Sequence, residues 1–238
     1  MSRWESLLLV QGHDTRVDQL THRLATLPER ARLAEVAEQV GALDAKRALV
    51  EERRGELSRS QQRLEDEVAS LTERATQAEK QPYSGAISNP RELQALQDDI
   101  ASIRRRIGQI EDQELEIMEL SEPVDADLAT LDAERERLDA ETQRVTAELA
   151  ESEASIGGDL DAVRRERAAA AETVPDDLWA EYDTLRSQLG GVAIARLVGS
   201  TCQGCHLALS AVEVDRIRKL SPEEKVHCEE CGRLLVRD

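Results

Sequence analysis

Apolar residues recur every seven positions through most of the chain, which is the pattern of a coiled coil. In the first half the repeat passes through Val36, Leu43, Val50, Leu57, Leu64, Leu71 and Ala78. In the second half it passes through Leu96, Ile103, Ile110, Ile117, Val124, Leu131, Leu138 and Val145. Each run predicts a long helix that buries one narrow apolar stripe against a partner helix.

A turn-rich stretch separates the two runs. Residues 82–90 include Pro82, Gly85 and Pro90, which do not fit one unbroken helix. Asn89 is suited to be the N-cap of the second helix, with Pro90 as its first residue and Glu92 in its first turn. Two helices of similar length joined by a short connection predict an antiparallel hairpin over residues 1–174, with its tip at residues 82–90. The alternative, a parallel dimer of one continuous helix, fits this stretch poorly.

Three places are expected to perturb the helices. An earlier apolar repeat falls out of phase near Pro28, which predicts a kink or a short break. The second repeat passes through Pro123 without slipping, which predicts a bend in a helix that continues. Gly157 and Gly158 are expected to loosen the returning helix.

Polar residues replace apolar ones at part of the first seam. Arg47, Arg54 and Gln61 occupy its companion position. Two interpretations are open: these side chains accept a third helix from a partner, or their long stems cover the solvated edge of the seam.

The pattern changes after residue 174. A short joining helix is predicted over residues 175–191, beginning near Pro175 and ending at Gly190 and Gly191. A strand is then predicted at 192–198, short helices at Ser210 and Ser221, which each start a capping box, and a closing strand at 234–236. Residues 192–238 therefore form a separate small domain.

All four cysteines lie in this small domain, as two C-x-x-C pairs: Cys202 with Cys205, and Cys228 with Cys231. Two such turns can present four thiolates to one tetrahedral zinc ion, so a zinc ribbon with one structural Zn²⁺ is predicted. Four protein ligands leave no open position for water or substrate. Two disulfides or a redox pair are the alternatives, and both fit less well in a reducing compartment without a thioredoxin-like setting.

Other residues of the ribbon have supporting roles. His206 and His227 are expected to be bystanders, because four sulfur ligands saturate the metal. Gly204 and Gly232 lie in or just after the turns, where a left-handed backbone is often required.

Composition favours an extended protein over a globular one. The 238 residues include no Phe, two Trp and two Tyr, and 34% of them are charged. The net charge is −18, but residues 190–238 contain equal numbers of basic and acidic residues, so the excess acid lies in the helices. An acidic coiled coil repels nucleic acid, so any such contact must come from the ribbon.

Several functional classes are disfavoured. The apolar run Leu7–Val10 is too short for a signal sequence or a membrane span, so a cytoplasmic protein is expected, with no membrane association. There is no phosphate-binding loop and no H-E-x-x-H motif, and the four histidines are scattered. We therefore expect no enzymatic activity and no small-molecule substrate.

Three stretches together resemble a bacterial family of long helical-hairpin proteins with a C-terminal four-cysteine zinc ribbon. They are Leu9–Asp14, the tip from Tyr83 through Leu96, and Cys228–Leu235. The resemblance covers essentially the whole chain. It implies a non-enzymatic adaptor tied to protein partners in transcription, flagellar or secretion pathways, and for some members nucleic-acid binding by the ribbon.

Two functional hypotheses follow. The first is an adaptor that binds protein partners through the hairpin or the ribbon, with Tyr83 and Ile87 at the tip as candidate contacts. The second is a module for DNA or RNA, connected with transcription, that uses the basic residues of the ribbon. Those candidates are Arg196, Arg216, Arg218, Lys219, Arg233 and Arg237.

Overall fold

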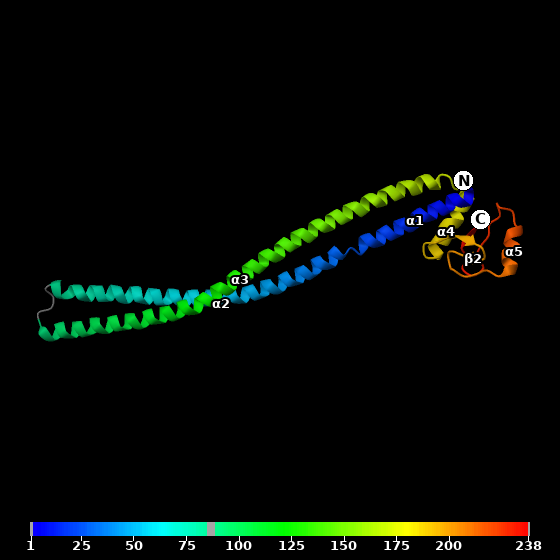
Figure 1. Ribbon diagram of the computed structural model, residues 1–238. Helices are drawn as coiled ribbons and strands as arrows, with labels where there is room; N and C mark the ends of the chain where they lie inside the picture. Colours follow the sequence, from blue (N-terminus) through cyan, green and yellow to red (C-terminus); the bar gives the residue numbers. More distant parts are fainter. Residues whose placement is uncertain (1, 85–88, 238) are drawn as a thin grey trace. The chain divides into compact units, whose positions relative to one another are not determined.

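The computed structural model describes residues 2–84 and 89–237 of the chain (Figure 1). Its elements, in order, are α1 (Arg3–Ala25), α2 (Pro28–Lys80), the 3-10 turn η1 (Gln81–Ser84), α3 (Pro90–Ala171), α4 (Asp176–Gln188), β1 (Ile194–Val198), β2 (Thr201–Cys202), α5 (Ala211–Lys219) and β3 (Leu234–Arg237). The fold is mostly α, with long helices in a hairpin and a small C-terminal sheet, as predicted. Contacts divide the chain into two compact units, described separately below: Arg32–Arg144, and Met1–Ala31 together with Val145–Asp238.

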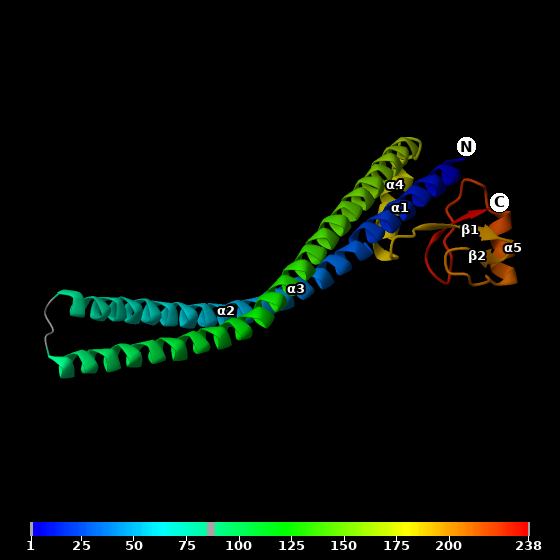
Figure 2. The same cartoon turned by 60° about the vertical axis from the view of Figure 1, so that its left-hand side comes forward.

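Within the Arg32–Arg144 unit, α2 and α3 run antiparallel and side by side (Figures 1 and 2). Val36 and Leu43 of α2 pack with Leu138 of α3, and all three are buried. Every apolar residue of the two seven-residue repeats that lies in this unit is buried or half-buried. The seven-residue repeats therefore identified the packed faces correctly.

The polar seam residues are bound within the hairpin itself. Arg47 donates to Asp132 and Arg54 donates to Asp125, each over 2.7 Å. The two pairs are seven residues apart on both helices, so they lie at successive heptads of the same antiparallel register. Gln61 donates to Glu65 on its own helix over 2.8 Å. These contacts favour the interpretation that long polar side chains cover the edge of the seam.

The helix boundaries follow the local signals in most places. The chain leaves helical geometry at Thr26 and Leu27, and Pro28 begins α2, so the expected break is present. Helix α3 continues through Pro123, as predicted, and also through the two glycines at 157 and 158. Asn89 caps α3, because its side-chain oxygen accepts from the backbone N–H of Arg91 over 3.0 Å.

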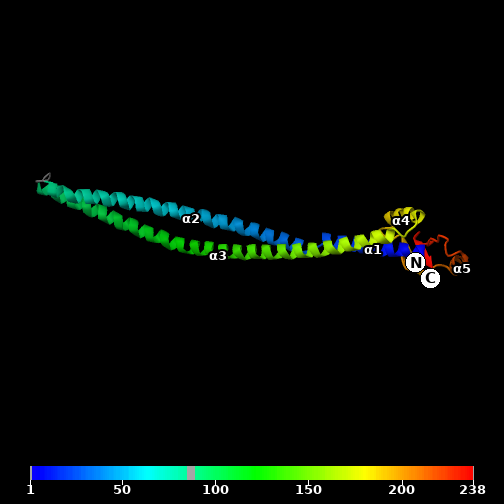
Figure 3. The same cartoon turned by 90° about the horizontal axis from the view of Figure 1, so that it is seen from above.

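In the other unit, α1 packs against the C-terminal part of α3 and against α4 (Figure 3). Leu20 and Leu27 meet Ile156 and Leu160 in one buried cluster. A second cluster joins Trp4, Leu7 and Val10 of α1 to Leu178 and Tyr182 of α4, and to the ribbon strands through Ile194, Leu234 and Val236. The first helix therefore contributes to the core on which the small domain rests.

The ribbon is a three-stranded sheet in the order β2-β1-β3, in which β1 pairs antiparallel with β2 and parallel with β3. Helix α5 packs on it through Val214 and Ile217, and Ser210 caps that helix as predicted. The helix expected at Ser221 is wrong. The Ser221 hydroxyl does accept from the backbone N–H of Glu223, and the backbone N–H of Ser221 donates to the Glu224 carboxylate, but these residues form only a turn. Arg237 donates to the carbonyl groups of Ser221 and Glu224, and the carbonyl of Val226 already accepts from the backbone N–H of Leu235, so only one turn fits before the chain joins the ribbon.

Candidate metal centre

Four cysteines from two turns meet at one point in the ribbon. The sulfur atoms of Cys202 and Cys231 are 4.0 Å apart, those of Cys205 and Cys228 are 3.9 Å apart, and all four lie within 4.8 Å of one another. A tetrahedron with Zn–S bonds of about 2.3 Å places its sulfur atoms about 3.8 Å apart. The arrangement fits one tetrahedral zinc ion and is too open for disulfide bonds.

The two turns repeat one backbone pattern. In the first turn the N–H of Cys202 donates to the carbonyl of Leu207, and the N–H of His206 donates back to the carbonyl of Cys202. In the second, the N–H of Cys228 donates to Arg233, and the N–H of Gly232 donates back to Cys228. The same loop is therefore used twice, and each copy directs two sulfur atoms to the metal.

The repeat shows which residues need a left-handed backbone. The position after each second cysteine has a positive φ, 61° at His206 and 73° at Gly232. The expectation for Gly232 is confirmed, whereas that for Gly204 is wrong, because the positive-φ position of the first turn is His206. Gly204 is needed for space instead: a Cβ there would lie 2.7 Å from Cδ of Arg233 and 3.0 Å from Cβ of Ala195.

Electrostatics explain why this cluster calls for a cation. Burial raises the pKa of the Cys202 thiol and raises the pKa of the Cys228 thiol to about 12. Burial also raises the pKa of Cys231, but hydrogen bonds outweigh it, first those from the backbone and side chain of Arg233 and then those with Cys228 and Cys205, so this pKa falls to about 7. A zinc dication would stabilise all four groups as thiolates. The site would then be saturated, and its role is to hold the two turns together.

The neighbouring histidine contacts protein groups. Nδ1 of His227 lies 3.1 Å from the carbonyl oxygen of Gly232, and its Nε2 lies 3.0 Å from a carboxylate oxygen of Glu181 in α4. Lys225 donates to the same Glu181 over 2.7 Å. The second turn is thereby attached to α4.

Five of the six candidate nucleic-acid residues are bound to other parts of the chain. Arg196 pairs with Glu5, Arg216 with Glu213 and Lys219 with Asp215. Arg233 donates to backbone carbonyls of Val192 and Leu189, and Arg237 donates to four carbonyls around the end of α5. The side chain of Arg218 is exposed and makes no hydrogen bond or ion pair within residues 2–84 and 89–237. Nucleic-acid binding stays a prediction.

The candidate contacts at the tip are not tested. The backbone of Tyr83 belongs to η1, and its side chain and Ile87 lie outside the described residues.

The sequence did not indicate a buried polar cluster near the start of the chain. Asp14 accepts from the hydroxyl of Tyr182 over 2.7 Å and from Nε of Arg167 over 2.8 Å. Gln11, one turn earlier, donates to the carbonyl of Gly191 and accepts from the backbone N–H of Ala193. Both residues lie in the Leu9–Asp14 stretch on which the resemblance depends, but sequence alone gave them no role, because their partners are more than 150 residues away.

Comparison with known protein families agrees with this architecture. Residues 10–190 match the CT398-like coiled coil hairpin domain, and residues 201–235 match the C4-type zinc ribbon domain. Neither family is an enzymatic type. Together with the four clustered sulfur atoms, the ribbon match supports one structural zinc ion.

Similar proteins match over the full length. The uncharacterized protein Rv2229c of Mycobacterium tuberculosis is 26% identical over 237 residues, which are 100% of this chain and 96% of the relative. A solved structure from Mycobacterium smegmatis has a TM-score of 0.85 at 23% identity, covering 99% of this chain and 97% of that one. CT398 from Chlamydia trachomatis has a TM-score of 0.64 at 19% identity, covering 99% and 98%. These solved structures share the fold, and the family match over residues 10–190 shows that the chain belongs to the CT398-like coiled-coil hairpin family.

Proposed function

We propose that the protein is a non-enzymatic, zinc-stabilised adaptor that binds protein partners through its hairpin or its ribbon. The observation that carries this proposal is that the candidate metal site is closed by four thiolates and serves to hold the ribbon, while the helices leave large apolar side chains exposed outside their seam. Such a molecule offers surfaces for recognition and no open coordination position for chemistry.

The exposed apolar residues of α3 support a protein partner. Leu115 and Met118 are 58% and 54% exposed and stand one helical turn apart, on a different face from the buried Ile110. Single exposed apolar residues are ordinary on a protein surface. An exposed pair one turn apart would anchor an amphipathic partner helix.

A reducing compartment such as the cytoplasm suits this proposal, because it would keep the thiols available for zinc. Within the described parts of the chain, every helix is too short or too polar to cross a lipid bilayer.

The alternative proposal is a nucleic-acid-binding ribbon, and it has less support. Five of its six candidate cations already bind carboxylates or carbonyl groups of the protein. Titration with salt tests it directly, because phosphate contacts predict an affinity for single- or double-stranded probes that falls steeply as salt increases. Absence of binding at low salt would end this alternative.

The adaptor proposal is tested by affinity capture from native lysate, with and without nuclease, followed by direct binding of each purified protein that is captured. We expect at least one protein to be retained after nuclease treatment and to bind the purified chain. Leu115→Ser with Met118→Ser tests the exposed face of α3, and Tyr83→Ala with Ile87→Ala tests the tip. The proposal is wrong if no captured protein binds directly, or if all binding disappears with nuclease.

A further inference from the structure

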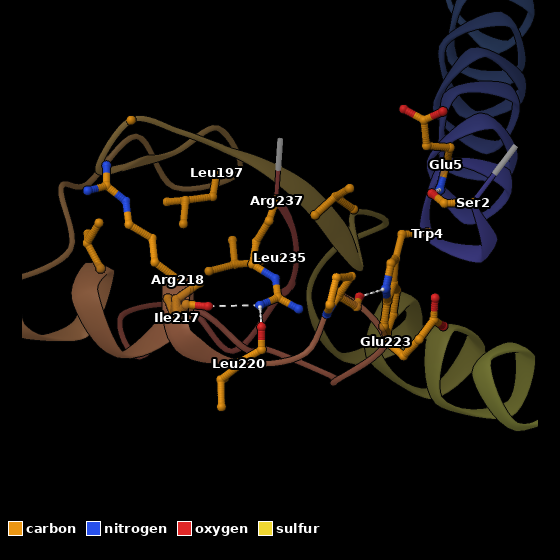
Figure 4. A pocket seen from close by; sticks show the side chains of 14 residues that line it. Ser2, Trp4, Glu5, Leu197, Ile217, Arg218, Leu220, Glu223, Leu235 and Arg237 are labelled. Carbon is orange, nitrogen blue, oxygen red and sulfur yellow. Dashed lines mark hydrogen bonds between the residues drawn. The ribbon is translucent and has the colours of Figure 1, made fainter.

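A groove lies where the N-terminal turn of α1 meets the ribbon, within one compact unit (Figure 4). Its volume is about 590 Å³, within the range of about 300 to 1,000 Å³ in which proteins bind small ligands and short segments. Apolar side chains of β1, α5 and β3 line it, among them Leu197, Ile217 and Leu235. The cysteines do not line it, so it is distinct from the metal centre.

Most polar groups around the groove already have partners. Nε1 of Trp4 donates to the carbonyl of Pro222 over 2.9 Å, and Arg3 binds both the carbonyl and the carboxylate of Glu223. Arg237 crosses the groove and donates to the carbonyl groups of Ile217 and Leu220 at the end of α5. These contacts hold the walls in place without an occupant, so the groove is preformed.

Arg218 is the exception. It lines the groove, and its exposed side chain makes no hydrogen bond or ion pair with any residue of the described chain. In Figure 4 its side chain lies at one end of the groove, Trp4 and Glu5 lie at the other, and Leu197 and Leu235 lie between them. The groove therefore offers an apolar floor with one available cation at its end.

We infer that this groove binds a short apolar segment of a partner protein that carries a carboxylate, and that Arg218 pairs with that carboxylate. The inference rests on the adaptor function proposed above and names the chemistry of one contact. The apolar residues of the segment would cover Leu197 and Leu235, and a planar carboxylate matches the planar guanidinium group of Arg218.

Charge favours a peptide over nucleic acid as the occupant. The opposite end of the groove is lined by Glu5 and Glu223, whose carboxylates pair with Arg196 and Arg3, so the cations there are already bound. The zinc-bound thiolates would add about two negative charges to the ribbon. A phosphate backbone needs several cations and would find one available in this groove, whereas a segment with a single carboxylate needs only one.

The probe is a library of random heptapeptides displayed on phage and selected against the full-length, zinc-loaded protein. Selected peptides are synthesised, and their affinities are measured by fluorescence polarisation for the wild type, Arg218→Glu and Lys219→Glu. Lys219 is the matched control, because it is the next residue of α5, carries the same charge, is exposed and does not line the groove. Zinc content and circular dichroism establish that all three proteins are folded.

We expect the selected peptides to combine apolar residues with Asp or Glu. Their affinity should fall about 10- to 100-fold on Arg218→Glu, as for loss of a hydrogen-bonded charge pair, and change less than about twofold on Lys219→Glu. Replacing the peptide carboxylate by Lys should restore binding to Arg218→Glu and weaken binding to the wild type. This exchange of charges would identify the pair directly.

Failure of this inference is distinct from failure of the adaptor function. The inference is wrong if no peptide is selected, if selected peptides bind Arg218→Glu as tightly as wild type, or if an oligonucleotide or a second copy of the chain proves to be the ligand lost on Arg218→Glu. If partners captured from lysate bind the wild type and Arg218→Glu equally, the groove is not their site, although the adaptor function stands. If no partner binds at all, the adaptor function itself is wrong.

Discussion

Replacing Asp14 by Ala should destabilise the unit formed by α1, the end of α3, α4 and the ribbon by about 2 to 4 kcal/mol. Its carboxylate is 6% exposed and accepts from the hydroxyl of Tyr182, which is fully buried. A buried hydrogen bond to a charged group contributes about 1.5 to 3 kcal/mol. The pair with Arg167, whose side chain is 30% exposed, is screened by solvent and adds about 0.2 to 1 kcal/mol.

Tryptophan fluorescence during unfolding in urea is suited to this measurement. Both tryptophans of the chain, Trp4 and Trp179, lie in this unit, and the guanidinium group of Arg167 stacks 4.9 Å from the centre of the Trp179 ring. Glu153→Ala is a matched control, because it removes a half-exposed ion pair with Arg30 in the same compact unit and should cost less than about 1 kcal/mol.

A double-mutant cycle tests the reasoning itself. Tyr182→Phe removes the hydroxyl that donates a hydrogen bond to Asp14. Asp14→Ala alone leaves that hydroxyl buried without an acceptor, whereas the double variant does not. The loss of stability in the double variant should therefore be smaller than the sum of the two single losses. Additive losses, or a change below about 0.5 kcal/mol for Asp14→Ala, would refute the interpretation that this carboxylate joins α1 to α4.

Three further predictions concern the ribbon and the hairpin. Removal of zinc with a chelator should unfold the ribbon while the long helices remain folded, because structural zinc contributes about 10 to 16 kcal/mol to folding of such domains. Hydrogen exchange measures this, and ribbon amides that stay protected without zinc would contradict the prediction. Gly232→Val should weaken zinc binding, because a β-branched residue strains the backbone at φ 73°. His206→Gly should relieve backbone strain at φ 61° and leave zinc binding unchanged or tighter. Competition with a chelator measures both. Hydrogen bonding from Arg32 lowers the pKa of Glu141 below its ordinary value of 4.5. This pair therefore stabilises the fold above pH 4.5, and the contribution is lost as the pH falls through the lowered pKa. The melting temperature of Glu141→Gln should vary less with pH over this interval than that of the wild type, and identical profiles would contradict the prediction.

Some features of the metal centre could be predicted and others could not. The spacing of the cysteines identifies four ligands, because two residues between thiolates suit one tight turn. The same spacing does not show that His206 takes the left-handed position or that Gly204 lies against Arg233. Those properties depend on how the two turns pack on the sheet.

The polar residues of the hairpin show the same division. The repeat places Arg47 and Arg54 at the seam, but their role follows from the carboxylates that face them on the antiparallel helix. A repeat in one helix specifies which face is packed and leaves the partner residues undetermined. Only the register of the two helices brings these charges together.

The amino-acid sequence alone determined the helices, their apolar stripes, the reversal between them and the zinc ligands, because each depends on residues close together in the chain. Tertiary structure decided the rest: the joint made by Gln11, Asp14 and Tyr182, the turn at Ser221 that Arg237 contacts, and the groove beside Arg218. In each of these places, residues far apart in sequence meet. Which partner satisfies a buried polar group, and which cation stays without one, is known only once the chain has folded.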